Sequence, residues 1–340
     1  MKILRLMLFP FSILFGISIW FRNLLFDLHI LKNNQIPIPS IGVGNLSTGG
    51  TGKTVVIDYL INLLKDQYSI GMLSRGYKRE TSGVVLANKS SRVQQIGDEP
   101  YQLLKKHPEI QVVVAEKRIL GIQKFLGLSK PPDVVLLDDI MQHRYVVPDL
   151  LIMTTTYQNP YFSDFLLPSG NLREPRAGSK RANILLVTKC PATLDQDQKN
   201  SFLKRVRFSS NQHIFFTKIK YGNYLTNGVH KIALNQVKNP FLLVTGIANS
   251  MPLVKFLKGL KYDFTHLKFS DHHSFSPDDR MKIKERIGKG MILTTEKDFT
   301  RLEPLLGKKN IYYLPIEMGF VNSEDQKHFD QFIQKQMELF

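Results

Sequence analysis

The sequence has a single cysteine, Cys190, among 340 residues. One cysteine excludes an intrachain disulfide and a metal site built from clustered cysteines, and it fits a reducing compartment such as the cytoplasm. Acidic residues are also scarce, since 29 Asp and Glu face 46 Lys and Arg, which gives a net charge of +17. This imbalance predicts an anionic partner: a nucleotide, an acidic lipid, a membrane surface or a nucleic acid.

Long hydrophobic runs are absent except near the N-terminus, where residues 6–21 are uncharged and rich in aromatic side chains. The run is shorter than the roughly 18–20 residues that cross a bilayer, and Pro10 interrupts it. No small residues follow it as a signal-peptide cleavage site would require. With Lys2, Arg5 and Arg22 as flanking cations, residues 1–30 predict a membrane-associating helix; the alternative is a helix buried against the protein's own core.

From residue 36 onward, short apolar runs alternate with amphipathic stretches of helical period, as in an α/β protein with a parallel sheet. The strands expected in the first half span residues 40–43, 70–73, 111–115, 134–137, 150–153 and 184–187. Helices are expected to begin near Thr54, Pro100, Lys117 and Ala192. A second series of strands is expected at residues 241–245, 264–269, 291–294 and 311–314. We therefore expect a core domain at residues 31–205 and a smaller C-terminal α/β domain at residues 206–340.

A glycine-rich segment, residues 41–54, links the first expected strand to a helix and ends in Gly-Lys-Thr. This order of strand, loop and helix is typical of a phosphate-binding P-loop, although Ser47 replaces the first glycine of the strict pattern. Lys53 is expected to reach the β- and γ-phosphates, and the Thr54 hydroxyl is expected to bind magnesium. The alternative is a glycine-rich surface turn. The residues predicted to contact the nucleotide are Gly49, Gly50, Thr51, Gly52, Lys53 and Thr54.

Two acids, Asp138 and Asp139, follow an apolar strand and are the best candidates for the carboxylates that hold the metal in a P-loop protein. Taken alone, such a pair also marks a strand's exit into solvent. GTP is disfavoured because residues 188–191 lack the Asn and Asp of a guanine-reading motif. Thr48 stands where partitioning ATPases carry a lysine, which weakens that class.

Two further clusters contain groups able to act as a base. Asp98 precedes a helix-like run, where helix capping is an equal explanation, and His272 lies in a loop after an expected strand. A carboxylate and an imidazole together could deprotonate an alcohol that attacks a γ-phosphate.

These segments together resemble the tetraacyldisaccharide 4′-kinases, the lipid A kinases of Gram-negative bacteria. The resemblance runs from about Arg22 to about Leu302 in ordered blocks. Besides the P-loop, the blocks are Arg22-Asn23-Leu24-Leu25-Phe26-Asp27, Ser74-Arg75-Gly76-Tyr77, Gly97-Asp98-Glu99-Pro100, Leu137-Asp138-Asp139, Gln142-His143-Arg144, Leu167-Pro168-Ser169-Gly170, Leu172-Arg173-Glu174-Pro175, Val187-Thr188-Lys189-Cys190-Pro191, Asp271-His272 and Thr294-Thr295-Glu296-Lys297-Asp298.

The resemblance implies a kinase that uses ATP and Mg²⁺ to phosphorylate the 4′-hydroxyl of an acylated disaccharide 1-phosphate lipid, forming lipid IVA. It implies that Asp98 is the base assisted by His272, and that Asp138 and Asp139 hold the metal with Thr54. It places the protein at an anionic membrane surface, on the cytoplasmic face of the inner membrane, with no nucleic acid and no obligate protein partner. The residues implied to line the substrate are Arg75, Tyr77, His143 and Glu174.

Two departures from the family pattern follow the acid pair, where Ile140 and Met141 replace Gly and Phe. If that glycine has positive φ, a β-branched residue would change the turn that aims Asp139 and His143. Asn171 also replaces a common proline, which affects loop stiffness more than chemistry.

Two other functions compete with the kinase. One is a membrane-recruited P-loop ATPase switch that acts on a protein partner, and it leaves Asp98 and His272 unexplained. The other is nucleic-acid binding through the basic residues 204–220, but basic runs are usually solvated and no nucleic-acid module is recognisable.

Overall fold

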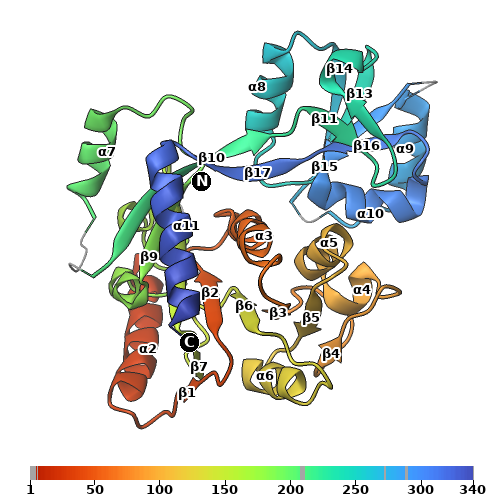
Figure 1. Cartoon of the computed structure of the whole chain (residues 1–340). Helices are drawn as coiled ribbons and strands as arrows, with labels where there is room; N and C mark the ends of the chain where they lie inside the picture. The colour runs from red at the N-terminus through yellow and green to blue at the C-terminus, as the bar shows by residue number, and fades with distance from the viewer. Residues whose placement is uncertain (1–4, 6, 207–210, 272, 288–289, 340) are drawn as a thin grey trace.

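The computed structural model describes residues 5, 7–206, 211–271, 273–287 and 290–339. Figure 1 shows two lobes, each built on its own sheet. Within the described residues, one sheet has nine strands in the order β17-β10-β9-β8-β2-β6-β3-β5-β4. The other has six, in the order β12-β11-β16-β15-β13-β14, and β1 pairs with β7 separately. The large sheet is parallel at its centre and antiparallel at both edges, whereas the small sheet is antiparallel at the β12 edge and parallel from β16 to β14.

The strands of the large sheet are β2 (Ser40–Gly44), β3 (Ile70–Ser74), β4 (Val85–Leu86), β5 (Gln111–Val114), β6 (Val134–Asp138), β8 (Leu150–Thr156), β9 (Ile184–Thr188), β10 (His213–Tyr221) and β17 (Ile316–Phe320). The strands of the small sheet are β11 (Tyr224–Thr226), β12 (Lys231–Ala233), β13 (Phe241–Thr245), β14 (Phe264–Lys268), β15 (Ile292–Thr295) and β16 (Ile311–Leu314). The separate pair consists of β1 (Asn34–Gln35) and β7 (Val146–Val147).

The α-helices are α2 (Phe9–Asp27), α3 (Lys53–Leu64), α4 (Val93–Ile96), α5 (Asp98–Lys106), α6 (Arg118–Leu126), α7 (Gln196–Leu203), α8 (Met251–Gly259), α9 (Pro277–Ile287), α10 (Glu296–Leu306) and α11 (Ser323–Glu338). Short 3₁₀ turns are η1 (Tyr161–Ser163), η2 (Arg176–Arg181) and η3 (Leu234–Gln236).

The central strands are buried on both faces because helices cover both sides of the large sheet. Every residue of β2, β6 and β9 is buried, which explains their continuous apolar runs. Helices α3, α5 and α11 pack into one hydrophobic core, and α6 and α7 contribute to the core on the other face. The expected α/β fold, with a P-loop core, a second α/β unit and an N-terminal apolar helix, is confirmed.

All ten expected strands are present, and three of the four expected helix starts fall within two residues. The helix expected near Ala192 begins later, at Gln196, because the Asp195 carboxylate caps it by accepting a hydrogen bond from the Gln198 backbone N–H. Strands β10 and β17 are not among those expected from the sequence. These two strands pair with each other antiparallel at one edge of the large sheet, where only the middle of β10 is buried and the apolar run is short.

The expected domain division between residues 205 and 206 stays a prediction. The later part of the chain contributes strands to both sheets. Strand β10 joins the large sheet, the chain then forms the small sheet, and β17 returns to the large sheet. Helix α11 then packs on the large sheet through Phe329 and Ile333.

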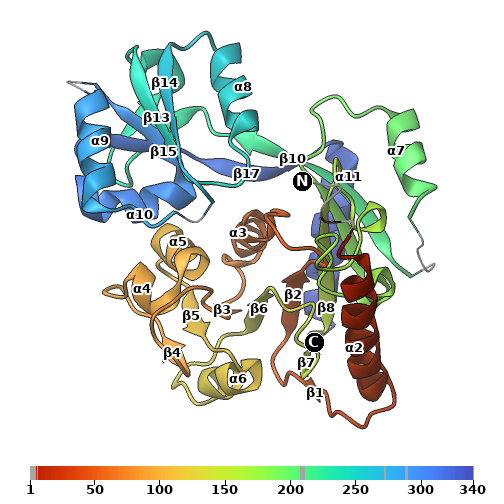
Figure 2. The same cartoon turned by 180° about the vertical axis from the view of Figure 1, so that it is seen from behind.

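Helix α2 lies against the large lobe but leaves most of its apolar residues exposed. Figure 2 shows it from behind, standing beside β7 and β8. Phe11, Leu14 and Trp20 are 58–64% exposed, whereas Phe26 is buried. The helix is long and apolar enough to cross a membrane, and 11% of its most apolar window is buried within the protein. Because so little of it is buried, the alternative of an ordinary core helix is disfavoured.

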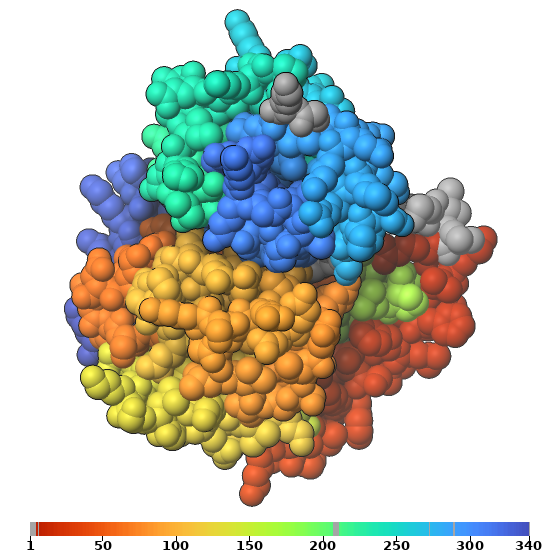
Figure 3. Space-filling view, turned by 90° about the vertical axis from the view of Figure 1, so that its right-hand side faces the viewer, coloured from red at the N-terminus to blue at the C-terminus, as the bar shows by residue number. Residues whose placement is uncertain are grey.

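The two lobes contact each other where α10 lies on α5. Figure 3 shows this seam from the side, with the blue C-terminal part resting on the gold residues around 100. The seam adjoins the P-loop edge of the large sheet, because α5 also contacts α3.

Candidate active site

The P-loop lies between β2 and α3, as the sequence predicts. Gly49 and Gly52 have φ of +105° and +91°, a left-handed conformation that glycine adopts without strain. The loop therefore turns sharply into the N-terminus of α3, which carries no acidic residue in its first turn. Free backbone N–H groups and the positive end of the helix dipole make this position suitable for phosphate.

Residues on β8 and at the end of β9 hold the loop in place through hydrogen bonds. The Thr188 hydroxyl at the end of β9 donates to the Thr51 carbonyl at 2.7 Å, and the Lys189 ammonium donates to the Gly50 carbonyl at 2.6 Å. The Thr51 hydroxyl is hydrogen-bonded to that of Thr154 on β8 at 2.7 Å. The loop is thus fixed by the sheet before any ligand arrives.

Lys53 connects the loop to the acid pair. Its ammonium donates to the Asn45 side-chain oxygen at 3.1 Å and lies 3.3 Å from the Asp139 carboxylate. Thr54 follows it in the first turn of α3 and is partly exposed. A cation and a carboxylate therefore meet at the start of α3.

Asp138 is the last residue of β6 and is buried. Burial raises the pKa of its carboxyl to about 6, the negative charge of Asp139 adds to this effect, and Lys53 opposes it. The charge of Glu99 on α5 also raises the pKa of Asp138. The charges of Lys53 and Glu99 therefore act on the same buried carboxyl.

Asp139 has the opposite shift. Burial alone would raise its pKa, but two hydrogen bonds from Arg173, at 2.7 and 2.8 Å, and the charge of Lys53 hold the pKa well below its usual range. The carboxylate is ionised at neutral pH. Arg173 also donates to the Asn45 carbonyl at 3.0 Å, so this arginine joins the acid pair to the P-loop.

The turn after the acid pair does not require a positive φ at Ile140, the residue that replaces the family's glycine. The residue with positive φ is Asp139, at +49°, and not Ile140. Ile140 and Met141 are buried, and they pack so closely against Gly42 and Gly44 of β2 that a Cβ there would come within 2.7 Å of them. The two departures therefore fill apolar space under the turn instead of straining it.

His143 lies on the same turn and is partly buried. Its Nε2 accepts a hydrogen bond from the Arg118 backbone N–H at 3.4 Å. Burial lowers the pKa of its imidazole to about 4, and the charges of Arg118, Arg75 and Arg22 add to the effect. The ring is therefore neutral at pH 7, and the cluster of arginines around it favours an anionic ligand.

Glu174 is fully buried beside this turn. Its two carboxylate oxygens accept hydrogen bonds from Gln142 at 2.8 Å and from Arg181 at 2.7 Å. Gln142 also donates to the Asn45 carbonyl, so Glu174 supports the turn and the P-loop from beneath. Arg75 and Tyr77, by contrast, are exposed on the loop after β3.

Asp98 begins α5, directly after Gly97, whose φ is +89°. A Cβ at Gly97 would lie 3.0 Å from the Tyr77 carbonyl, so only glycine fits here without a shift. Asp98 is paired through both oxygens with Arg301 of α10. His272, its expected helper, lies outside the described residues. The neighbouring His273 contacts Asp279 at 2.8 Å.

The structure thus brings Lys53, Asp138 and Asp139 together and places α5 nearby. Several contributors were missed as site residues from the sequence: Asn45, Ser74, Arg118, Arg173 and Arg301. Arg173 precedes Glu174 in a recognised block, so its position in that motif was the available signal. Ser74 donates to Asp138 at 3.0 Å, and only the alignment of β3 with β6 reveals it.

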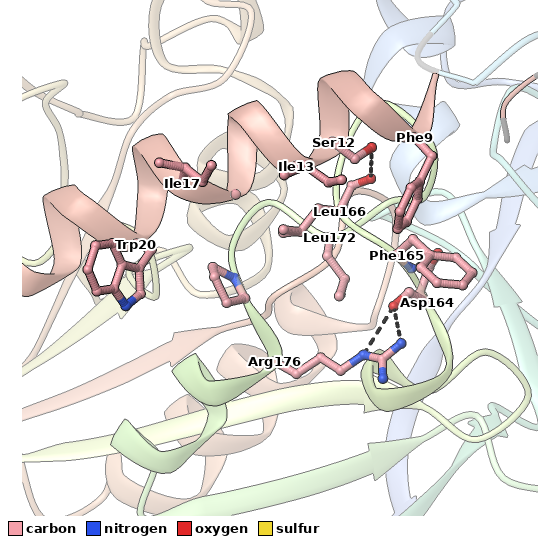
Figure 4. A pocket seen from close by; sticks show the side chains of 12 residues that line it. Phe9, Ser12, Ile13, Ile17, Trp20, Asp164, Phe165, Leu166, Leu172 and Arg176 are labelled. Carbon is pink, nitrogen blue, oxygen red and sulfur yellow. Dashed lines mark hydrogen bonds between the residues drawn. The ribbon is translucent and has the colours of Figure 1, made fainter. Parts of the chain in front are cut away.

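An apolar groove of about 470 Å³ runs between α2 and the segment 164–176. Figure 4 shows its two walls, with the Ser12 hydroxyl donating to the Leu166 carbonyl at one end. The apolar side chains that line it include Phe9, Ile13 and Trp20 from α2, and Phe165, Leu166 and Leu172 opposite. Leu172 directly precedes Arg173, so the groove adjoins the charged site.

No group of three or more His, Cys, Asp or Glu side chains that could hold a metal is found among the described residues. The Asp138 and Asp139 carboxyls supply oxygen atoms at this edge of the sheet. Carboxylate and hydroxyl oxygens are the donors that Mg²⁺ prefers.

Comparison with known proteins gives one family. The family model of the tetraacyldisaccharide-1-P 4′-kinases (LpxK) matches residues 4–338. The tetraacyldisaccharide 4′-kinase of Flavobacterium psychrophilum is 45% identical over 334 residues, covering 97% of this chain and 96% of that protein. The enzyme of the same name from Bacteroides thetaiotaomicron is 42% identical, covering 96% of this chain and 91% of that protein.

Among solved structures, the "apo" form of LpxK from Aquifex aeolicus in complex with ATP is similar, with a TM-score of 0.79 and 31% identity. The match covers 98% of this chain and 99% of that one.

Proposed function

Because the chain belongs to the tetraacyldisaccharide-1-P 4′-kinase family, we propose that the site at the P-loop edge transfers the γ-phosphate of ATP to the 4′-hydroxyl of an acylated disaccharide 1-phosphate. The chain is a kinase of lipid A biosynthesis by family, and the roles of its residues are our proposal. The product is the bis-phosphorylated lipid.

One geometric observation carries the proposal: the Ser74 hydroxyl donates to Asp138 at 3.0 Å, and Gly97, which precedes Asp98, lies so close to Gly76 that a Cβ on Gly97 would be 3.1 Å from it. Lys53 lies 3.3 Å from Asp139 of the same acid pair. The phosphate-binding loop, the acid pair and the start of α5 therefore share one edge of the sheet. Phosphoryl transfer requires mainly charge neutralisation, alignment and a base near the attacking hydroxyl. The edge contains groups for each of these tasks.

We assign the steps as follows. Gly49, Gly50, Thr51 and Gly52 hold the β- and γ-phosphates through backbone N–H groups, and Lys53 neutralises their charge. The Asp98 carboxylate, assisted by His272, accepts the proton of the 4′-hydroxyl. The hydroxyl oxygen forms a bond to the γ-phosphorus while the bond to the β-phosphate oxygen breaks, and ADP leaves with that electron pair.

Magnesium fits the residues present. Asp138 is a buried carboxyl next to a second carboxylate, an arrangement that a divalent cation would stabilise. Thr54, Asp138 and Asp139 would hold the ion, which would supply charge neutralisation to the phosphates when bound.

For the lipid substrate, we assign the headgroup to the arginine-rich surface around His143, with Arg75 and Tyr77 exposed beside it and Glu174 supporting it from below. The groove between α2 and residues 164–176 is apolar and adjoins Arg173, so it suits an acyl chain. The anionic headgroup and the apolar chains would then bind to neighbouring surfaces.

The exposed face of α2 supports association with an anionic membrane, and we propose the cytoplasmic face of the inner membrane, where ATP is present. Replacing Phe11 and Leu14 by Glu is expected to lower binding to phosphatidylglycerol-containing vesicles at least about tenfold, because the apolar area that the two side chains bury in the bilayer is lost. The measurement is vesicle co-sedimentation.

The matched control replaces Leu260 and Met281, which are also exposed but lie on the small lobe, by Glu. This control should bind vesicles as the unmodified protein does. Equal binding by the α2 variant and the unmodified protein would remove α2 from the membrane contact.

The function is tested by transfer of labelled γ-phosphate from ATP to tetraacyldisaccharide 1-phosphate in detergent. Stoichiometric labelling of the lipid is expected, together with an equal amount of ADP. ATP hydrolysis that leaves the lipid unlabelled would contradict the kinase and favour the ATPase switch.

A further inference from the structure

Arg301 of α10 reaches across the seam between the lobes to Asp98 of α5. Its Nε donates to Oδ1 of Asp98 at 3.1 Å, and its Nη2 donates to Oδ2 at 2.8 Å. The two residues are 203 positions apart in the chain. Their side chains are 9% and 13% exposed, so this paired contact is largely shielded from water.

Arg301 is itself fixed to the small lobe. Its Nη1 lies 3.4 Å from Oδ1 of Asp298, which is fully buried one turn earlier on α10. Oδ2 of Asp298 accepts hydrogen bonds from the Gly246 backbone N–H and from the Thr295 hydroxyl, both at 2.8 Å. The guanidinium is therefore held by Asp298, which is fixed in turn by Gly246, directly after β13, and by Thr295, the last residue of β15. The position of Arg301 thus depends on the position of the small sheet.

A guanidinium paired with both carboxylate oxygens sets the plane of the carboxylate as well as its charge. A general base requires this, because proton transfer depends on the direction in which the oxygen lone pairs point. A carboxylate has about four lone-pair sites, and the two hydrogen bonds from Arg301 use two of them. Asp98 can thus accept a substrate proton while Arg301 stays in place.

We propose that Arg301 is a positioning residue for Asp98, so that the base is correctly oriented only when α10 of the small lobe lies on α5. The proposal rests on the proposed function, in which Asp98 accepts the proton of the 4′-hydroxyl. It assigns helix α10 of the small lobe a part in catalysis, although the P-loop and the acid pair belong to the large sheet.

A second ion pair at the same seam provides the matched control. Lys297 lies one turn before Arg301 on α10 and contacts Glu99 at 3.0 Å, next to Asp98. Replacing Lys297 by Met removes an ion pair between the lobes and leaves the contact of Arg301 with Asp98 unchanged. A residue that only joins the lobes should behave like Lys297.

The test is a double-mutant cycle on lipid phosphorylation by the full-length protein, using Arg301→Met and Asp98→Asn. In the unmodified background, Arg301→Met is expected to lower kcat about 10- to 100-fold, with both KM values within about twofold. In the Asp98→Asn background it should change kcat by less than about twofold, because the carboxylate it orients is already gone. Lys297→Met should have the same effect in both backgrounds.

Arg301→Lys separates orientation from charge, since lysine keeps the charge but lacks the planar fork. Its kcat is expected to lie between those of the unmodified protein and Arg301→Met. ATP binding and the thermal unfolding midpoint of each variant establish that it is folded. If Arg301→Met does not fold, Arg301→Lys is used in the same cycle.

An equal loss of kcat from the Arg301 change in both backgrounds would overturn the proposal, because Arg301 would then act independently of Asp98. A loss that appears only in KM would overturn it as well. If Asp98→Asn alone leaves kcat unchanged, Asp98 is not the base, and the roles assigned to Asp98 and Arg301 both fail. Lipid phosphorylation by the unmodified protein is measured separately, so a failure of the kinase function is distinguishable from a failure of these roles.

Discussion

Replacing Asp98 by Asn is expected to lower kcat for lipid phosphorylation about 10²- to 10⁴-fold, the range of a general base. Asn keeps the size of the side chain, but it cannot accept a proton at neutral pH. Affinity for ATP should stay within about threefold, because Asp98 contacts Arg301 and not the P-loop. Steady-state kinetics and equilibrium ATP binding measure the two effects separately.

The control for this variant is Asp195→Asn, which changes a capping carboxylate at the start of α7. It should leave kcat unchanged. A value of kcat for Asp98→Asn within about threefold of the unmodified protein would show that Asp98 is a structural helix-start residue and that the base lies elsewhere.

The second large effect is expected from Asp139→Asn. The Asp139 carboxylate lies 3.3 Å from the ammonium of Lys53 and is paired with the guanidinium of Arg173, so its loss leaves two cations without their common partner. Asn tolerates the positive φ of this position, so the turn itself should be retained. We expect kcat/KM for ATP to fall about 10²- to 10³-fold, as when one preorganised electrostatic contact to a reacting group is lost.

Kinetics measured across a range of Mg²⁺ concentrations test this prediction, and Asp133→Asn is the matched control. Asp133 precedes β6 at the opposite end of the same strand, where its carboxylate accepts a hydrogen bond from the Ser69 backbone N–H at 2.8 Å. That variant should keep full activity. If Asp139→Asn stays within about fivefold at every Mg²⁺ concentration, Asp139 has no part in holding the nucleotide or its metal.

The two carboxyls of the acid pair lie in different electrostatic environments. Asp138 is desolvated and its pKa is raised to about 6, whereas Asp139 is held ionised by Arg173 and Lys53. Neighbouring carboxyls with pKa values pushed apart are typical of functional sites. The difference depends on Arg173, which comes from a loop 34 residues later in the chain.

The sequence by itself determined the local features of this protein. The P-loop could be read directly because its conformation depends on glycines at fixed spacing and on the helix that follows them. The buried strands could be read because helices cover both faces of the sheet, which leaves continuous apolar runs. The apolar run of α2 indicated a helix that either meets a membrane or is buried in the core, and only the structure showed that most of it is exposed.

Only the tertiary structure decided how the pieces of the site meet. The contacts of Arg173 with Asp139, and of Arg301 with Asp98, join residues 34 and 203 positions apart, and no periodicity in the sequence specifies such pairings. The positive φ of Asp139 likewise depends on how Ile140 and Met141 pack against the glycines of β2. Local chemistry specifies what each segment can form, whereas long-range packing sets which charges lie together.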